Sequence, residues 1–251
     1  MTKLIITALL ATLILGCKGK TENEKDESVA ESTPMAETPT PEAEWTVLFD
    51  GTSFDGWKEY LKDGVSDHWK LEDGAMVLHP PKDRKKGEAY NLVTTKNFTD
   101  FELSLDWRIS EGGNSGVFWG VMEMPSLPEA YQTGPEIQVL DNEKHPDAKV
   151  GTTHQAGSLY DMIGPSKDVT KPVGEWNTMV IKVNHKTNQG SVTLNGEEIV
   201  TFPTNDPGWS AMVSKSKFAD WDHFGKHPTG KIGLQDHGDM VSFRNIKIKE
   251  L

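Results

Sequence analysis

From residue 45 onward, apolar side chains alternate with polar ones, and turn-forming residues interrupt the pattern at short intervals. The clearest run is residues 101–109 (FELSLDWRI), which stops at Glu111-Gly112-Gly113-Asn114. A period of two turns one face of a strand toward a core and the other toward solvent or a ligand. No segment shows a sustained apolar stripe with the helical period. The pattern therefore predicts a domain built from strands.

Further runs of the same kind continue to the C-terminus. They span residues 117–121, 136–140, 179–183, 191–194, 197–202, 231–235 and 240–249. Asn195-Gly196 separates two of them, and this pair favours a tight hairpin because both residues tolerate positive φ. The 23 glycines and 14 prolines suit many short strands and turns. We predict an all-β fold over residues 45–251, a two-sheet β-sandwich or jelly roll.

The N-terminus has the features of an export signal. A basic start precedes an uncharged apolar run from Leu4 to Gly16, which is shorter than the roughly 20 residues of a membrane-spanning helix. The end of this run resembles a bacterial lipoprotein signal, with Cys17 as the single cysteine. The resemblance implies a signal peptide over 1–16, removed before Cys17, and acylation of Cys17, palmitate included. We expect a lipid-anchored protein of the cell envelope, periplasmic or at the outer membrane of a Gram-negative-type bacterium. The alternative is a plain secretory signal.

Residues 17–44 are rich in Glu, Ser, Thr and Pro and contain no aromatic residue. Such a segment buries too little apolar area to offset its ordering entropy, so we predict a disordered acidic tether. The whole chain has a formal net charge of −12, which argues against a nucleic-acid partner. Its single cysteine excludes an intramolecular disulfide and a cysteine-rich zinc site.

Six short motifs then occur in order along the predicted domain. They are residues 48–57 (LFDGTSFDGW), 114–116 (NSG), 136–141 (EIQVLD), 157–161 (GSLYD), 174–177 (GEWN) and 233–246 (GLQDHGDMVSFRNI). Together they resemble the signatures of the 3-keto-disaccharide hydrolase domain family, formerly a domain of unknown function. The resemblance implies a concanavalin-like jelly roll in a secreted sugar-degrading enzyme. It also implies a carbohydrate partner, a glycoside already oxidised to the 3-ketone.

Cleavage of a 3-keto-glycoside needs a base and an electrophile. The C3 ketone acidifies the hydrogen at C2, and the enolate formed by its removal can expel the aglycone from C1. We propose Glu136, His154 and His237 as catalytic candidates, since histidine titrates near neutrality and Glu136 lies opposite the apolar Ile137 on its strand. Arginine, a charged histidine or a divalent metal suits the enolate oxygen. No ordered set of metal ligands is visible in the sequence, so a possible divalent ion stays open as cofactor.

Polar and aromatic residues near these motifs are candidates for binding the sugar. Polar groups bind hydroxyls, and aromatic rings stack on the apolar faces of pyranoses. The candidate substrate-binding residues are Asp106, Arg108, Asn114, Trp119, Gln138, Tyr160, Gln235 and Arg244. Trp209 and Trp221 are further aromatic candidates, and the loop residues His145, His223 and His227 are candidates for the lining of a cleft.

Two other functions are compatible with the same residues. Retaining glycosidases of this fold carry Glu-x-Asp-x-x-Glu, and the corresponding positions here are Glu136, Gln138 and Asp141. Hydrolysis by two carboxylates would require Asp141 to reach the face of Glu136, which needs a β-bulge in the strand. The other alternative is a lectin-like carbohydrate-binding lipoprotein without catalytic activity.

Overall fold

The computed structural model describes residues 44–251. The predicted signal peptide (1–16), the predicted lipidation site Cys17 and nearly all of the predicted tether (17–44) lie outside the described residues. Within 44–251, no helix has the length and apolar character needed to cross a membrane. The described elements belong to one compact unit.

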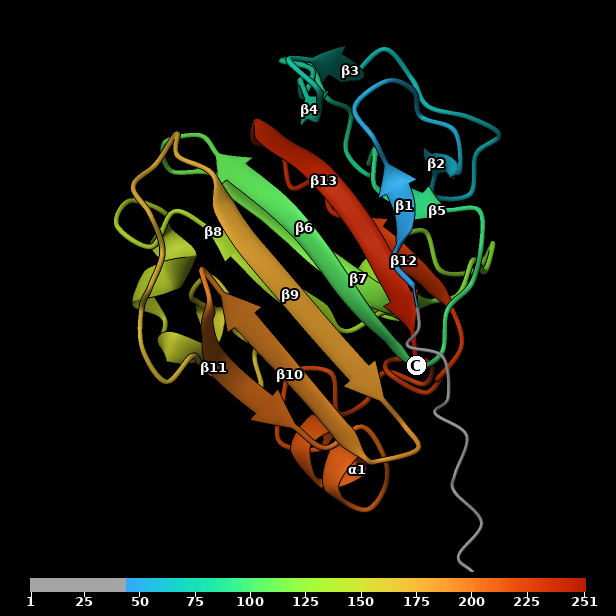
Figure 1. Cartoon of the computed structure of the whole chain (residues 1–251), viewed down its shortest axis with the longest axis vertical. Coiled ribbons are helices and arrows are strands. Elements are labelled where there is room, and N and C mark those ends of the chain that lie inside the picture. Colours follow the sequence, from blue (N-terminus) through green and yellow to red (C-terminus); the bar gives the residue numbers. More distant parts are fainter. Residues whose placement is uncertain (1–43) are drawn as a thin grey trace, which may run out of the picture. The chain divides into compact units, whose positions relative to one another are not determined.

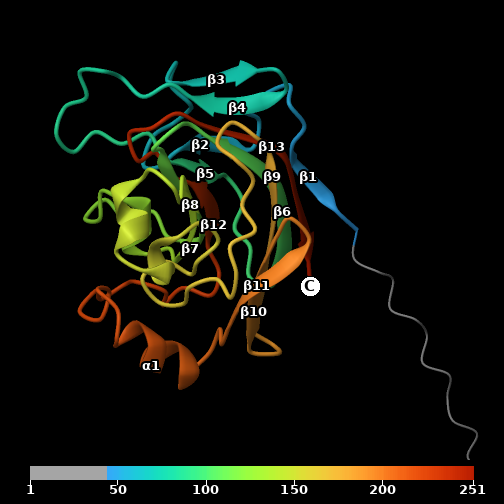
Figure 2. The same ribbon diagram turned by 90° about the vertical axis from the view of Figure 1, so that its left-hand side faces the viewer.

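Within residues 44–251, thirteen strands form two antiparallel sheets that pack face to face (Figure 1, Figure 2). The eight-stranded sheet has the order β11-β10-β9-β6-β13-β4-β3, and β1 pairs with β13. Its strands are β1 (Thr46–Phe49), β3 (Trp69–Glu72), β4 (Ala75–Leu78), β6 (Phe101–Ile109), β9 (Asn177–Asn184), β10 (Gln189–Leu194), β11 (Glu197–Phe202) and β13 (Val241–Glu250).

The five-stranded sheet has the order β2-β5-β12-β7-β8. Its strands are β2 (Trp57–Glu59), β5 (Leu92–Thr94), β7 (Asn114–Val121), β8 (Glu136–Leu140) and β12 (Lys231–Leu234). Helical structure among the described residues is limited to α1 (Gly208–Val213) and the 3₁₀ turns η1 (Ala130–Gln132), η2 (Pro146–Lys149) and η3 (Thr152–His154). The all-β sandwich predicted from the alternation is confirmed.

The core lies between the two sheets because alternate residues of both point inward. On β6, Leu103, Leu105 and Trp107 are at most 1% exposed, and the residues between them are only partly buried. From the other sheet, Ile137 and Val139 of β8 enter the same cluster. The burial of this apolar area is the main stabilising contribution to the fold.

The hairpin predicted at Asn195-Gly196 is present between β10 and β11. Asn195 has a φ of 51° and Gly196 a φ of 87°, which is the left-handed geometry of a tight two-residue turn. This hairpin lies at one edge of the eight-stranded sheet.

The second face of β8 points away from the core. Glu136 and Gln138 alternate with Ile137 and Val139, so both lie on the outward face of the five-stranded sheet. Gly116 of β7 pairs with Gln138, and β12 lies on the other side of β7. Three adjacent strands therefore form the floor of a site on this face.

Candidate active site

A cavity of about 350 Å³ lies over β7, β8 and β12, within the size range of small-molecule sites. It is lined by Asn114, Tyr131, Glu136, Gln138, Tyr160, Lys217, Phe218, Trp221, Gln235 and His237. The structure thus brings together two of the proposed catalytic residues, Glu136 and His237, with four of the proposed sugar-binding residues.

Glu136 is a buried carboxyl group in the cavity floor, with 7% of the residue exposed. Its side chain lies over Gly116, where a Cβ atom would overlap it. Glu136 Oε2 accepts a hydrogen bond from Gln235 Nε2 at 3.2 Å. Burial raises the pKa of Glu136 to about 8, although the charge of Lys217 and the Gln235 bond act in the opposite direction. A carboxyl with this pKa suits proton transfer near neutral pH.

Two amide oxygens of cavity-lining residues have no hydrogen-bond partner among the described residues. Asn114 and Gln235 are 3% and 6% exposed, and no described residue donates a hydrogen bond to Asn114 Oδ1 or Gln235 Oε1. A buried acceptor without a donor is unfavourable, so such atoms mark places where a ligand donor is favoured. Sugar hydroxyls are donors of this kind. Gln138, 1% exposed, completes the amide-rich floor.

Aromatic rings and one lysine form the wall of the cavity. Tyr131 and Trp221 lie with ring centroids 5.9 Å apart, and Phe218 lies 5.1 Å from Trp221. Lys217 Nζ lies 4.1 Å from the centroid of the Tyr160 ring. The wall therefore combines surfaces for stacking on a pyranose with a positive charge near Glu136.

His154 lies behind this wall and does not line the cavity. Its Nδ1 lies 2.9 Å from Asp147 Oδ1 and its Nε2 lies 3.0 Å from Asp161 Oδ1. Asp147 Oδ2 also accepts the hydroxyl of Tyr160 at 3.0 Å, and burial with the neighbouring acids raises the pKa of that hydroxyl. Both ring nitrogens face carboxylates, and the ring is connected to the cavity only through Asp147 and Tyr160. The geometry therefore does not support direct proton transfer between His154 and a substrate, the role expected for it from the sequence.

His237 lies at the cavity in the turn that follows β12. The preceding residue holds this turn, since Asp236 accepts hydrogen bonds from Arg84 Nη2 at 2.6 Å and from the Tyr90 backbone at 2.9 Å. The His237 ring is accessible to solvent, but the surrounding cavity reduces its hydration and lowers its pKa, and nearby His145 adds to this effect. His237 therefore stays a candidate for proton transfer or metal binding.

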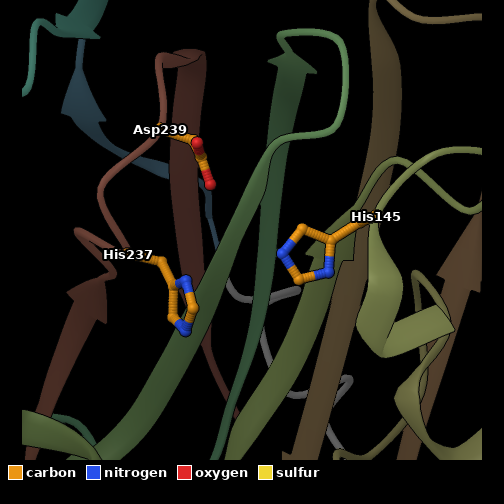
Figure 3. A group of neighbouring side chains, drawn as sticks. All are labelled: His145, His237 and Asp239. Atoms are coloured by element: carbon orange, nitrogen blue, oxygen red, sulfur yellow. The ribbon is translucent and has the colours of Figure 1, made fainter. Parts of the chain in front are cut away.

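His145, His237 and Asp239 are the described residues that are placed to hold a metal ion together. One potential ligand atom from each lies within 4.8 Å of the other two. Figure 3 shows the three side chains facing a common space. Glu136 is not part of this group.

Three predicted substrate-binding residues lie elsewhere. Asp106 and Arg108 of β6 and Arg244 of β13 belong to the eight-stranded sheet, and none lines the cavity. Arg244 Nε donates to Asp106 Oδ2 at 3.3 Å, and both arginines lie over the Trp176 ring, at 4.7 Å and 4.0 Å. The alternation in residues 101–109 shows that Asp106 and Arg108 point out of the core, but it does not show that their sheet faces away from Glu136. The expected contact of these three residues with a sugar at the Glu136 site is not supported by their positions.

Trp119 is also separated from Glu136. It is 6% exposed, points into the core and stacks on Phe202 with centroids 5.6 Å apart. With Trp209 and His227 it lines a different cavity of about 320 Å³. Its expected contact with the sugar at the Glu136 site is not supported by this position.

Asp141 does not provide a second carboxylate. β8 pairs with β7 in regular register, without the bulge that would turn Asp141 toward Glu136. Its oxygens instead accept the backbone N–H groups of Gly112 at 2.7 Å and Glu143 at 3.0 Å. Among the described residues, Glu136 is the one carboxylate that lines the cavity.

Sequence reasoning missed Lys217, Phe218 and Tyr131. Lys217 and Phe218 lie in the irregular segment between α1 and β12, and Tyr131 lies in the short turn η1. None of these segments has a periodic pattern that would orient its side chains. The aromatic content near residue 221 was the one available signal, and Trp221 does line the cavity.

Comparison with known proteins gives the family. The model of the 3-keto-alpha-glucoside-1,2-lyase-like domain matches residues 44–249, nearly the whole described region. The chain belongs to this family. A 3-keto-disaccharide hydrolase of Bacteroides thetaiotaomicron is 34% identical over 97% of this chain and 96% of its own length. The family resemblance seen in the motifs is thereby confirmed.

Solved structures agree with this membership in the 3-keto-alpha-glucoside-1,2-lyase-like family. A crystal structure from Parabacteroides distasonis, provisionally assigned as a glycosyl hydrolase, has a TM-score of 0.75 and 32% identity, covering 82% of this chain and 94% of that one. A Bacillus subtilis protein with a galectin-like fold has a TM-score of 0.51 at 12% identity over 78% of this chain and 90% of its own, which shows the fold alone. These relationships support glycoside cleavage as the general activity.

Proposed function

We propose that this protein cleaves 3-keto-glycosides by removing the proton at C2, with Glu136 as the base. The observation that carries this proposal is the isolation of Glu136. It is the one carboxylate lining the cavity among the described residues, and it is buried beside unpaired acceptors and aromatic rings. Conventional glycosidases need two carboxylates flanking the bond that is cleaved. A single base suffices where a neighbouring ketone acidifies the C–H bond.

The reaction balances as an elimination followed by hydration. Glu136 takes the C2 proton, and the electron pair of the C–H bond forms an enolate with the C3 carbonyl. Collapse of the enolate forms the C1–C2 double bond, breaks the bond from C1 to the aglycone oxygen, and the departing oxygen takes up a proton. Water then adds its oxygen to C1 and a proton to C2, which gives the free 3-keto-sugar.

The other cavity residues have matching tasks in this proposal. Lys217 supplies positive charge for the developing enolate, and Asn114 Oδ1 and Gln235 Oε1 accept hydroxyl protons of the sugar. Tyr131, Phe218 and Trp221 offer stacking surfaces for the ring or its aglycone. A charge and hydrogen-bond acceptors stabilise the transition state most when they are already in position before it forms. The burial and packing of these residues favour such a fixed position.

The test is a comparison of a 3-keto-glycoside with its parent glycoside in heavy water. We expect cleavage of the 3-keto compound alone, with deuterium at C2 of the released sugar and a slower reaction when C2 carries deuterium at the start. Cleavage of the parent glycoside, or an unlabelled C2 where spontaneous exchange is negligible, contradicts the proposal. Sugar binding without any turnover would instead indicate a lectin-like binding protein.

A further inference from the structure

A second group of side chains lies at the edge of the Glu136 cavity. His145 follows β8, whereas His237 and Asp239 follow β12. β7 pairs with both strands in antiparallel register, so β8 and β12 end where β7 begins, at Asn114. The topology therefore brings two distant loops together, and Figure 3 shows their three side chains facing one another. Their potential ligand atoms lie within 4.8 Å of each other.

We propose that His145, His237 and Asp239 bind one divalent transition-metal ion, such as Zn²⁺ or Mn²⁺, beside the cavity. Two imidazole nitrogens and one carboxylate form a donor set that suits these ions. Calcium prefers six or more oxygen ligands, so the two histidines argue against it. Three protein ligands also leave coordination positions open for water or substrate, as in catalytic rather than structural metal sites.

Two observations on Asn114, a residue outside the cluster, support this site. The Asn114 backbone N–H donates to Asp239 Oδ2 at 3.1 Å, which orients the carboxylate as an outer-shell partner does in metal sites. The Asn114 side-chain oxygen is buried and has no donor among the described residues. Asn114 and His237 line the same cavity, so this oxygen is available to an ion or to a water bound to one.

His145 adds a testable detail. Its Nδ1 accepts the backbone N–H of Asp147 at 3.1 Å, which leaves Nε2 for the cluster. A neutral imidazole that accepts at Nδ1 carries its hydrogen on Nε2. Coordination of an ion through Nε2 would require this hydrogen to move to Nδ1. The Nδ1 atom could then no longer accept the hydrogen bond from the Asp147 backbone N–H. Asp147 also contacts His154 and Tyr160, so ion binding is linked to the cavity wall.

An ion at this position would lie next to the proposed substrate cavity, because one of its ligands, His237, lines that cavity. In the proposed reaction it would serve as a Lewis acid for the ketone oxygen. That role rests on the proposed function, whereas the binding of the ion does not. The two ideas can therefore fail separately.

The test measures ion binding without substrate. The purified full chain is treated with chelator, dialysed, and titrated calorimetrically with Zn²⁺ and Mn²⁺, and bound metal is quantified by mass spectrometry. We expect one ion per chain at micromolar ion concentration. His237→Ala, His145→Gln and Asp239→Asn should each weaken binding at least tenfold. His79→Ala is the matched control, because His79 contacts Glu72 of the other sheet. This variant should bind the ion as the wild type does.

The variants are chosen to keep the fold. His237 is exposed, and glutamine or asparagine at 145 or 239 retains an acceptor for the neighbouring backbone N–H. Cobalt provides a second reading, because its visible spectrum reports nitrogen ligation and should be lost in His237→Ala. Absence of stoichiometric binding in the wild type, or equal binding by wild type and all three cluster variants, overturns the proposal.

Discussion

The position of Glu136 on strand β8 determines the burial of its carboxyl group and the charges around it. Its neighbours Ile137 and Val139 on β8 belong to the core, its own side chain lines the cavity, and the positive charge of Lys217 favours its ionised form. Burial dominates these contributions and raises the pKa of the carboxyl group to about 8. Activity and stability should therefore both depend on this one group.

The first prediction concerns the pH dependence of Glu136. A base acts in its ionised form, so kcat/KM should rise with pH up to about 8. Glu136→Gln should lower turnover by about 10²–10⁴-fold and remove this rise, because glutamine cannot take a proton. Steady-state kinetics across pH measure both effects. A wild-type profile that is flat between pH 6 and about 9, or an active glutamine variant, would contradict the assignment of the base.

The same substitution should alter stability in a pH-dependent way. The pKa of Glu136 is raised in the folded protein above the ordinary value of 4.5, so its favourable contribution is complete below that value and is lost as pH rises through about 8. Glu136→Gln does not ionise. Its melting temperature relative to wild type should therefore increase between pH 5 and about 9. A constant difference over this range would show that Glu136 titrates as an ordinary carboxyl.

The second prediction concerns Lys217. Its charge lowers the pKa of Glu136, so Lys217→Met should move the rise of kcat/KM to higher pH and reduce the rate at neutral pH. Lys215→Met is the matched control, because it removes an equal charge from a residue that lines a different cavity. Kinetic pH profiles of both variants make the comparison. Identical shifts in the two would indicate a general charge effect rather than a local one.

At the scale of elements, β7 leaves room for the catalytic side chain. The Glu136 side chain passes directly over Gly116, and this close approach is possible because glycine has no Cβ. Gln235, the residue directly after the neighbouring strand β12, donates a hydrogen bond to Glu136 Oε2. The position of the carboxyl thus depends on three strands that are far apart in the sequence.

The third prediction follows from this packing. Gly116→Ala should displace the Glu136 side chain and lower kcat strongly, with a destabilisation of about 1–3 kcal/mol from overpacking. Gly151→Ala is the control, since its Cβ would meet open space. Kinetics and thermal melting separate the two effects. Full activity of Gly116→Ala would show that the position of the carboxyl does not depend on this glycine.

At the scale of the whole molecule, the two sheets share one continuous core, and the described region forms one compact unit. The fourth prediction is that residues 45–251 unfold in a single cooperative transition with a strand-dominated circular dichroism spectrum. Deletion of residues 18–44 should change the melting temperature by no more than about two degrees, because a disordered segment contributes few stabilising contacts. Two transitions, or a larger shift, would contradict this organisation.

The fifth prediction concerns the proposed anchor at Cys17. A chain with two or more acyl groups binds membranes durably, so Cys17→Ser should move the protein from the detergent phase to the aqueous phase in phase partitioning. The melting temperature of the purified domain should not change. Recovery of the serine variant in the detergent phase would refute lipidation at Cys17.

The sequence by itself determined the fold class and much of the cavity floor. Alternation within a strand depends on neighbouring residues, so the pattern of residues 136–140 was sufficient to orient Glu136 and Gln138 opposite Ile137 and Val139. The Asn195-Gly196 turn is equally local, and its geometry was predicted correctly. The family motifs then identified the class of substrate to be tested.

Only the tertiary structure decided which outward faces meet. Asp106 and Arg108 are oriented outward as the alternation predicts, yet their sheet lies on the far side of the core from Glu136. Lys217 approaches Glu136 from an irregular segment, and His154 is held by two aspartates whose positions no period reveals. These outcomes depend on contacts between residues distant along the chain, and a local pattern contains no information about which distant segments will pack together.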